Sequence, residues 1–194
     1  MQIEPQALEN RFVRLEPIAP RHEAELRAAC GEDPTIWREL YPYSMVGEHF
    51  DLAWRRMLRD GRSGHSLVFA VVAGGRCRGM TCYLAIDPAN RSLEIGGTYY
   101  APELRGGAVN PAAKRLLLAH AFAAGASRVQ FKVDALNALS RAAVLKLGAV
   151  QEGILRQDRV TWTGRVRDTV VFSVLKDEWP AVRDRLDARL TALD

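Results

Sequence analysis

A short loop near the middle of the chain combines charge, small side chains and a helix start in a pattern that suits an anion. Arg105 is followed by Gly106 and Gly107, and Asn110-Pro111 opens a strongly apolar stretch. Glycine lets a ligand approach the backbone closely, Asn is favoured at a helix N-cap and Pro at the first helical position. Because the first N–H groups of a helix lack partners and carry partial positive charge, we expect this loop to bind a pyrophosphate. An ordinary strand-to-helix turn is the alternative.

Two common phosphate-binding motifs are absent from the sequence. A Walker A loop needs a lysine followed by Ser or Thr, whereas Lys114 is followed by Arg115 and falls inside the predicted helix. The dinucleotide pattern G-x-G-x-x-G is missing, and strands do not alternate regularly with helices. The loop therefore indicates neither of these nucleotide-binding folds.

A second motif, D-A-L-N-A-L-S-R-A-A-V-L-K-L-G-A, occupies residues 134–149. Its pattern predicts a strand that leads into a helix, with Asn137 and Ser140 near the helix start and Gly148 at its end. Asn137 is also a natural N-cap, and Ser140 is also an ordinary first-turn serine. Structural roles therefore stay open for both residues.

Together, and in this order, the two motifs resemble the cofactor motifs of GNAT-superfamily N-acetyltransferases, and the RimJ/RimL-like branch in particular. The first resembles [QR]-x-x-G-x-[GA], with Arg105 at its first position, although Ala108 and Asn110 depart from the last two. The second resembles N-x-x-S/A followed by a helix that ends in [KR]-[LC]-G-[FA]. The resemblance covers roughly residues 8–179 and includes the tail from Leu155, L-R-x-D-x-x-x-W-x-G-R-x-R-D-T.

The resemblance implies acetyl-CoA as co-substrate. The backbone of the glycine loop would hold its pyrophosphate, and a strand end would pair with its pantetheine arm. Asn137 would hydrogen-bond the pantetheine, and Ser140 would protonate the departing CoA thiolate. The implied cofactor-binding residues are Thr98, Tyr99, Tyr100, Arg105, Gly106, Gly107, Ala108, Val109, Asn110 and Asn137.

An amine acceptor must lose a proton before it attacks the thioester. At pH 7 this costs about 4.6 kcal/mol for a lysine-like amine and only about 1 kcal/mol for an α-amine. Glu94 and Asp158 are the candidate general bases, with a solvated surface carboxylate as the alternative for each. No cysteine or Ser–His pair is placed as a covalent nucleophile, so we expect direct transfer in a ternary complex. The acceptor is a protein N-terminus or a small-molecule amine.

Composition narrows the class of protein. The 194 residues are 48% hydrophobic and 26% charged, with a formal net charge of +4, which suits one globular domain. Three cysteines without a CxxC pair, and four histidines without HExxH, argue against a disulfide framework and a metal site. No signal pattern or membrane-length apolar run occurs. We expect a cytoplasmic protein that binds no DNA and that could form a homodimer through its last helix or a long hairpin.

Hydrophobic patterns predict one α+β domain over residues 1–194, with a mixed, mostly antiparallel central sheet flanked by helices. This is also the GNAT-like fold that the resemblance implies. The predicted strands are 11–18, 66–72, 76–87, 92–100, 127–133, 150–162 and 165–175. The predicted helices are 21–30, 34–40, 47–60, 111–124, 137–147 and 177–193, with Gly61 ending the third.

Two other functions remain open at this stage. A non-catalytic acyl-CoA-binding or sensing domain would share the fold without turning over any amine. A basic RNA-associated module is the other, although aromatic residues make up only 8% of the chain and no RNA-binding motif occurs. The aromatic loop Tyr41–Ser44 could wall an acceptor pocket or cover the edge of the core.

Overall fold

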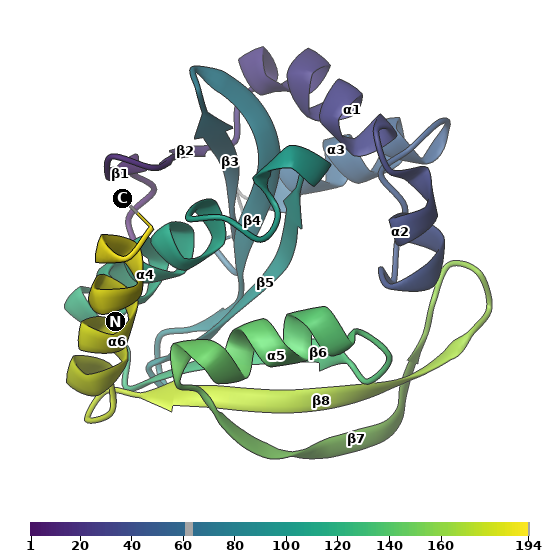
Figure 1. The fold of residues 1–194 in the computed structure, drawn as a ribbon. Helices are drawn as coiled ribbons and strands as arrows, with labels where there is room; N and C mark the ends of the chain where they lie inside the picture. The colour runs from purple at the N-terminus through teal and green to yellow at the C-terminus, as the bar shows by residue number, and fades with distance from the viewer. Residues whose placement is uncertain (61–63, 194) are drawn as a thin grey trace.

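Eight strands form one sheet in the computed structural model, which describes residues 1–60 and 64–193. The strand order is β1-β2-β3-β4-β5-β6-β8-β7, and only the β5–β6 pair is parallel among these described strands (Figure 1). The strands are β1 (Leu8–Glu9), β2 (Arg14–Pro17), β3 (Leu67–Ala73), β4 (Arg76–Asp87), β5 (Ser92–Tyr100), β6 (Arg128–Asp134), β7 (Val150–Val160) and β8 (Val166–Leu175). The predicted mixed, mostly antiparallel sheet is therefore confirmed.

Six α-helices flank the sheet in the described part of the chain: α1 (Glu23–Gly31), α2 (Pro34–Glu39), α3 (His49–Asp60), α4 (Val109–Ala123), α5 (Ala138–Leu147) and α6 (Trp179–Thr191). Two 3₁₀ turns, η1 (Pro20–His22) and η2 (Pro102–Leu104), precede α1 and α4. Each predicted helix is present with shifted ends, and the predicted stop at Gly61 lies outside the described residues. No helix in the described ranges is long and apolar enough to cross a membrane.

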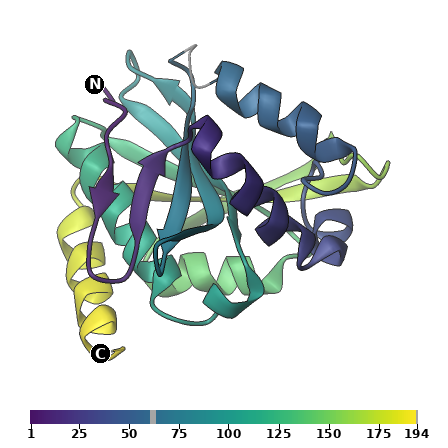
Figure 2. The same cartoon turned by 90° about the horizontal axis from the view of Figure 1, so that it is seen from above.

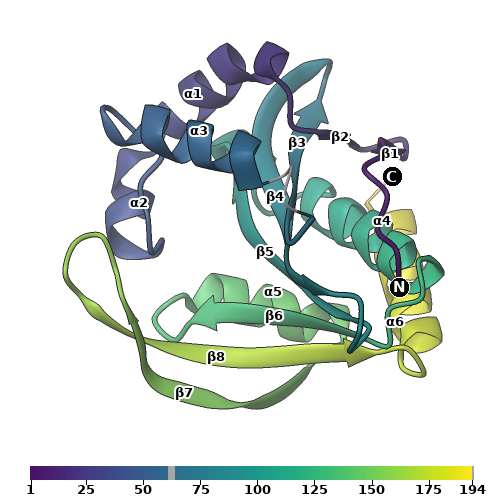
Figure 3. The same ribbon diagram turned by 180° about the vertical axis from the view of Figure 1, so that it is seen from behind.

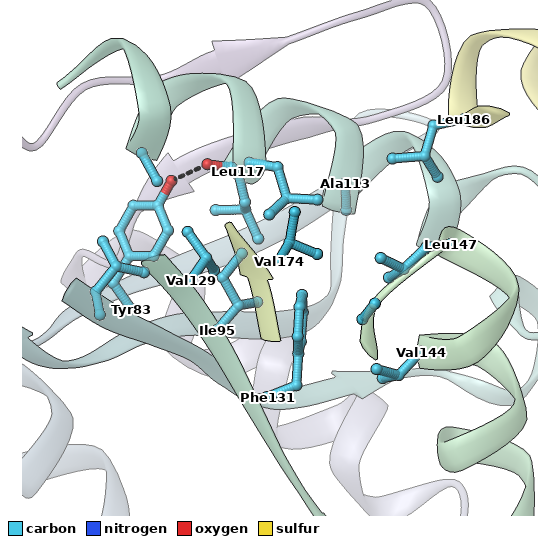
Figure 4. Packing of buried hydrophobic residues seen from close by; sticks show 14 of the residues in the cluster. Tyr83, Ile95, Ala113, Leu117, Val129, Phe131, Val144, Leu147, Val174 and Leu186 are labelled. Carbon is cyan, nitrogen blue, oxygen red and sulfur yellow. Dashed lines mark hydrogen bonds between the residues drawn. The ribbon is translucent and has the colours of Figure 1, made fainter. Parts of the chain in front are cut away.

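The sheet carries different helices on its two faces. The main core lies on the face that packs against α4, α5 and α6, which we call the α4 face (Figure 4). On it, Tyr83 donates a hydrogen bond to the carbonyl of Leu117 at 2.6 Å. A second core on the opposite face joins α1, α2 and α3 to the β3–β5 part of the sheet (Figure 3). Among the described elements, no helix covers most of the opposite face of the β6–β8–β7 part.

A β-bulge changes the direction of the side chains near the end of β5. Gly96 pairs with Cys82, and Tyr99 pairs with Met80. Two residues of β5, Gly97 and Thr98, therefore lie opposite one residue of β4, Thr81. Gly97 has φ +57°, which favours glycine. Ile95 therefore faces the α4 core before the bulge, whereas Tyr99 belongs to the opposite core after it.

Two boundaries differ from the sequence prediction in a way that matters for the site. Helix α4 begins at Val109 with Ala108 at its N-cap, two residues before the expected start. Pro111 fits inside the first turn because the N–H group it lacks would have no partner there. The predicted N-cap role of Asn110 is therefore wrong. The first predicted strand, 11–18, is shortened to β2, and a two-residue strand that was not predicted, β1, precedes it.

Apolar side chains are exposed along the β7–β8 hairpin, where homodimerisation was expected to be possible. The more exposed ones include Val150, Ile154, Leu155, Val160 and Val166. The homodimer stays a prediction.

One lysine lies inside the main core. Lys114 of α4 is 6% exposed, and its Nζ donates to Thr98 Oγ1 at 2.8 Å. Thr98 Oγ1 lies 2.8 Å from Thr81 Oγ1, so an amine–hydroxyl chain runs under the bulge. Burial lowers the pKa of Lys114 to about 7. The sequence analysis missed this contact because Lys114 stands in a run that reads as an apolar helix face.

Replacing Lys114 with methionine tests this burial. Lysine in the unfolded chain binds a proton up to about pH 10.4, whereas folded Lys114 loses its proton near pH 7. Between these values the unfolded state binds more protons, so wild-type stability relative to Lys114→Met rises with pH. At pH 7 we expect the variant to be more stable by on the order of a few kcal/mol, since one pKa unit is worth about 1.4 kcal/mol.

Urea unfolding of both proteins at pH 7 and pH 9.5 measures this difference, and other titrating groups cancel between the two. The advantage of the variant should shrink at pH 9.5. A difference that does not depend on pH would mean that Lys114 stays charged in the folded protein.

Candidate active site

The glycine loop before α4 offers open backbone. Gly106 and Gly107 are exposed, and a Cβ added at either position would meet no atom within 4 Å. Gly106 has φ +80°, a conformation that needs glycine. No side chain caps the start of α4 among the described residues, so the N–H groups of Val109 and Asn110 remain available. An uncapped helix start beside an open glycine turn fits a phosphate group.

The two departures from the family pattern do not obstruct this loop. Ala108 is partly buried and packs against the main core. Asn110 accepts a hydrogen bond on Oδ1 from the Tyr100 hydroxyl at 3.2 Å. Asn110 therefore ties the start of α4 to the end of β5.

Arg105 is held in place by its own chain. Its Nη1 donates to Asp33 Oδ2 at 2.6 Å, and its Nε donates to the Tyr100 carbonyl at 2.9 Å. Asp33 also accepts from the Ile36 N–H at the start of α2. Arg105 thus stands at the expected place beside the loop, but Asp33 offsets part of its charge.

Strands β5 and β6 separate in the middle of the sheet. Their pairing runs only from Ser92–Arg128 to Glu94–Gln130, after which β5 continues beside β4 and β6 continues beside β8. Residues 95–100 therefore have an edge without a strand partner on the β6 side. This separation occurs where the sequence analysis expected the pantetheine arm to pair.

Side chains already occupy two carbonyl groups of the predicted pantetheine-binding segment. The Thr98 carbonyl accepts from the Tyr41 hydroxyl at 2.5 Å, and the Tyr100 carbonyl accepts from Arg105. Tyr99 faces the second core and donates to the Ala29 carbonyl at 2.7 Å. The side chain of Tyr99 is therefore part of the second core, so any contact of Tyr99 with the cofactor would come from its backbone.

The second motif forms a capped helix start next to the separated strands. Asn137 Oδ1 accepts from the Ser140 N–H at 2.9 Å, which makes Asn137 the N-cap of α5. Gly148 ends the helix with φ +109°. Both side chains of the motif, Asn137 and Ser140, are partly exposed. The capping role is observed, while the cofactor contacts of both residues stay predictions.

Glu94 faces away from the main core, toward the helix-free part of the opposite face. Its Oε2 lies 3.7 Å from Lys132 Nζ. Burial raises the pKa of Glu94, while Lys132, Arg159 and Arg167 oppose that rise. A partly buried carboxyl with a raised pKa beside an open strand edge suits a general base.

Asp158 is differently placed. It accepts from the Thr169 hydroxyl at 2.8 Å and pairs with Arg159 at 3.2 Å. Burial favours its neutral form, but the Thr169 and Arg159 contacts prevail and lower its pKa. Lys132 and Arg159 act on both carboxyls, so Glu94 and Asp158 border the same polar region. Asp158 is therefore the weaker base of the two.

The tip of the β7–β8 hairpin extends toward α2 in the ribbon views (Figures 1, 2 and 3), and two hydrogen bonds join it to the end of that helix. Trp162 donates from Nε1 to the Trp37 carbonyl at 2.7 Å, and Arg165 donates to the Glu39 carbonyl at 3.0 Å. These carbonyls lie in the last turn of α2, where no helical N–H group is available to them. The hairpin thus closes one end of the polar region.

The aromatic loop between α2 and α3 mainly covers the second core. The Tyr41 ring contacts the Trp37 ring in a tilted arrangement with ring centroids 4.4 Å apart, and Tyr43 packs against the same core. Two shallow hollows lie elsewhere, one beside Arg91 and the other beside Leu52. Neither hollow contacts the predicted residues, so the site rests on the strand separation and the glycine loop.

Comparisons with known proteins agree with this geometry. Residues 13–150 match the family described as Acetyltransferase (GNAT) domain. A search of the curated proteins finds no match. A solved structure of a T. thermophilus protein, assigned to the acetyltransferases, is 38% identical with a TM-score of 0.88, covering 98% of this chain and 100% of that one.

Two further structures are similar. A GCN5-related N-acetyltransferase from Brucella melitensis is 34% identical with a TM-score of 0.86, covering 98% of this chain and 87% of that one. Mycobacterium smegmatis RimJ, solved with a CoA-disulfide, is 23% identical with a TM-score of 0.85 and 97% coverage of both chains, a likeness of fold. Because the family match spans most of the sequence, the chain belongs to the GNAT acetyltransferase family, and the enzyme class expected from its two motifs is confirmed.

Proposed function

We propose that the protein transfers the acetyl group of acetyl-CoA directly to a primary amine, either a protein N-terminal α-amine or a small-molecule amine. The observation that carries this proposal is the unpaired edge of β5 beyond Glu94, which runs into the uncapped start of α4. Acetyl-CoA would supply the activated acetyl group. The glycine loop would hold the pyrophosphate, and the β5 edge would lie along the pantetheine.

The acceptor amine would approach from the opposite face of the sheet, where Glu94 lies. Glu94 would take the proton of the amine, and a backbone N–H near the bulge would polarise the thioester carbonyl. Ser140 would return a proton to the CoA thiolate. An α-amine fits best because its deprotonation costs least near neutral pH.

Direct transfer is favoured by the state of the cysteines. Cys30, Cys77 and Cys82 are all buried. Burial raises the pKa of Cys77 to about 11 and that of Cys82 to about 12, and it raises the pKa of Cys30 further. Each thiol is therefore protonated near neutral pH and unsuited to carry the acetyl group.

A charge placed in the glycine loop tests the cofactor site. Gly107 is exposed and lies outside the left-handed backbone region, so a side chain fits there without strain. Gly107→Glu should weaken acetyl-CoA binding by about tenfold or more, because one carboxylate would stand against the pyrophosphate. Gly107→Gln, which has the same shape without the charge, should weaken binding much less.

Isothermal titration calorimetry with acetyl-CoA measures both variants. Equal affinity of wild type and Gly107→Glu would show that the pyrophosphate lies elsewhere.

Removing the carboxylate of Glu94 tests the general base. Glu94→Gln should lower kcat by about 100-fold. In the wild type this advantage should fade as the pH drops through the Glu94 pKa, which burial places above the ordinary value, because the protonated carboxyl accepts no proton. The ratio of wild-type to variant rates against pH shows this directly, since the ionisation of the amine cancels.

Asp158→Asn is the matched control and should leave that pH dependence in place. If the ratio of wild-type to Glu94→Gln rates does not change with pH, Glu94 is not the general base, and water takes the proton of the amine instead.

A further inference from the structure

Arg167 is a buried cation whose terminal nitrogens make no hydrogen bond within the described part of the chain. It lies on β8, facing the same side of the sheet as Glu94, and only 5% of its surface is exposed. Its Nε donates to Thr169 Oγ1 at 3.1 Å, and its closest carboxylate oxygen, Asp134 Oδ2, is 3.7 Å from Nε. Within residues 1–60 and 64–193, neither terminal nitrogen of Arg167 makes a hydrogen bond, and neither is sealed from solvent.

The neighbouring carboxylates are already engaged. Asp134 accepts from the Leu136 N–H on Oδ1 at 3.0 Å and from Arg165 on Oδ2 at 2.5 Å. Asp158 accepts from Thr169 and pairs with Arg159. The forked donor face of Arg167, which matches a carboxylate in shape, is therefore left unused.

The local balance of charge is also positive. Four cations and three carboxylates meet in this region, which leaves one cation in excess: Lys132, Arg159, Arg165 and Arg167 against Glu94, Asp134 and Asp158. A buried guanidinium costs folding free energy when its only carboxylate neighbour is as far as 3.7 Å and is itself shared with another arginine. Such a cost is commonly found where a protein receives an anionic ligand.

The position of Arg167 connects this anion site with the acceptor amine. Arg167 and Glu94 lie close enough to influence each other electrostatically. An anion on Arg167 would therefore lie on the same face of the sheet, and in the same polar region, as the amine that Glu94 is proposed to deprotonate. We propose that Arg167 is a specificity-determining residue that binds a carboxylate of the acceptor, an inference that rests on the proposed function. Preferred acceptors would then carry an acidic group near the amine.

This carboxylate has two possible sources, the α-carboxylate of a free amino acid or an acidic side chain at a peptide N-terminus. Two pairs of acceptors separate them: glycine against glycinamide, and an amidated Asp-Ala dipeptide against its Asn-Ala counterpart. For each, kcat/KM is measured from free-thiol release and corrected for the fraction of neutral amine. One acidic member should exceed its neutral partner by about tenfold or more, as hydrogen bonds to a charged group predict.

Arg167→Gln should abolish that preference. It should lower kcat/KM for the acidic member by about 10- to 100-fold and leave the neutral member within about threefold. Arg167→Lys should restore only part of the preference, because lysine lacks the fork. Arg159→Gln removes the same net charge from a cation that is already paired, and should keep most of the preference.

Stability separates this function from a structural role. Since the buried charge has only the 3.7 Å contact with Asp134 as an ion pair, Arg167→Gln should melt at the same temperature as wild type or higher. A lower melting temperature together with an unchanged acceptor preference would make Arg167 a structural residue and overturn the proposal.

Equal rates within both pairs, or turnover of the neutral members alone, would also overturn it. If acetyl-CoA does not bind, the proposed function fails instead. Calorimetric titration of wild type and Arg167→Gln with the Asp-Ala and Asn-Ala amides then still tests Arg167, because selective binding of the acidic probe needs no turnover.

Discussion

The separation of β5 from β6 is the constraint on which the rest of the structure depends. The two strands are parallel neighbours for only three residue pairs, up to Glu94 and Gln130. Unpaired backbone groups inside a sheet are costly unless something else pairs with them. In this protein the edge beyond Glu94 leads to the glycine loop and the uncapped start of α4. A narrow ligand that carries amide groups along its length and a phosphate group at one end fits this strand edge and helix start. The phosphopantetheine arm of acetyl-CoA is such a ligand.

The bulge at Gly97 decides what stands on each side of this opening. Before it, Glu94 faces away from the main core, toward the polar region. After it, Thr98 contacts Lys114 on the α4 face, and Tyr99 turns into the second core. A Cβ at Gly97 would lie 3.0 Å from Cys82 Sγ, so a larger residue would disturb the bulge as well as strain its backbone. One extra residue in β5 thus decides which side chains face the polar region and which face each core.

Two cations near the opening are buried although core side chains are usually apolar. Among the described residues, Lys114 donates to one hydroxyl, that of Thr98, and has no ion pair, and the terminal nitrogens of Arg167 make no hydrogen bond. Burial lowers the pKa of both. Groups of this kind reduce stability and gather at functional sites, because there their interactions with a ligand can repay the cost. The hydrogen bond from Trp162 at the hairpin tip to the end of α2 helps to hold the polar region in place, although the two buried cations reduce stability.

The amino-acid sequence by itself determined the local features of this protein. Strand and helix patterns, the glycine turn at Gly106, the cap at Asn137 and the stop at Gly148 all follow from neighbouring residues, and the two motifs were enough to indicate the family. Tertiary structure decided the rest. The start of α4, the Asp33 partner of Arg105, the burial of Lys114 and the unpaired fork of Arg167 depend on strand register and on contacts between distant segments. The bulge at Gly97 is the clearest case, because a single extra residue reverses which side chains face each core, and no local propensity encodes that pairing.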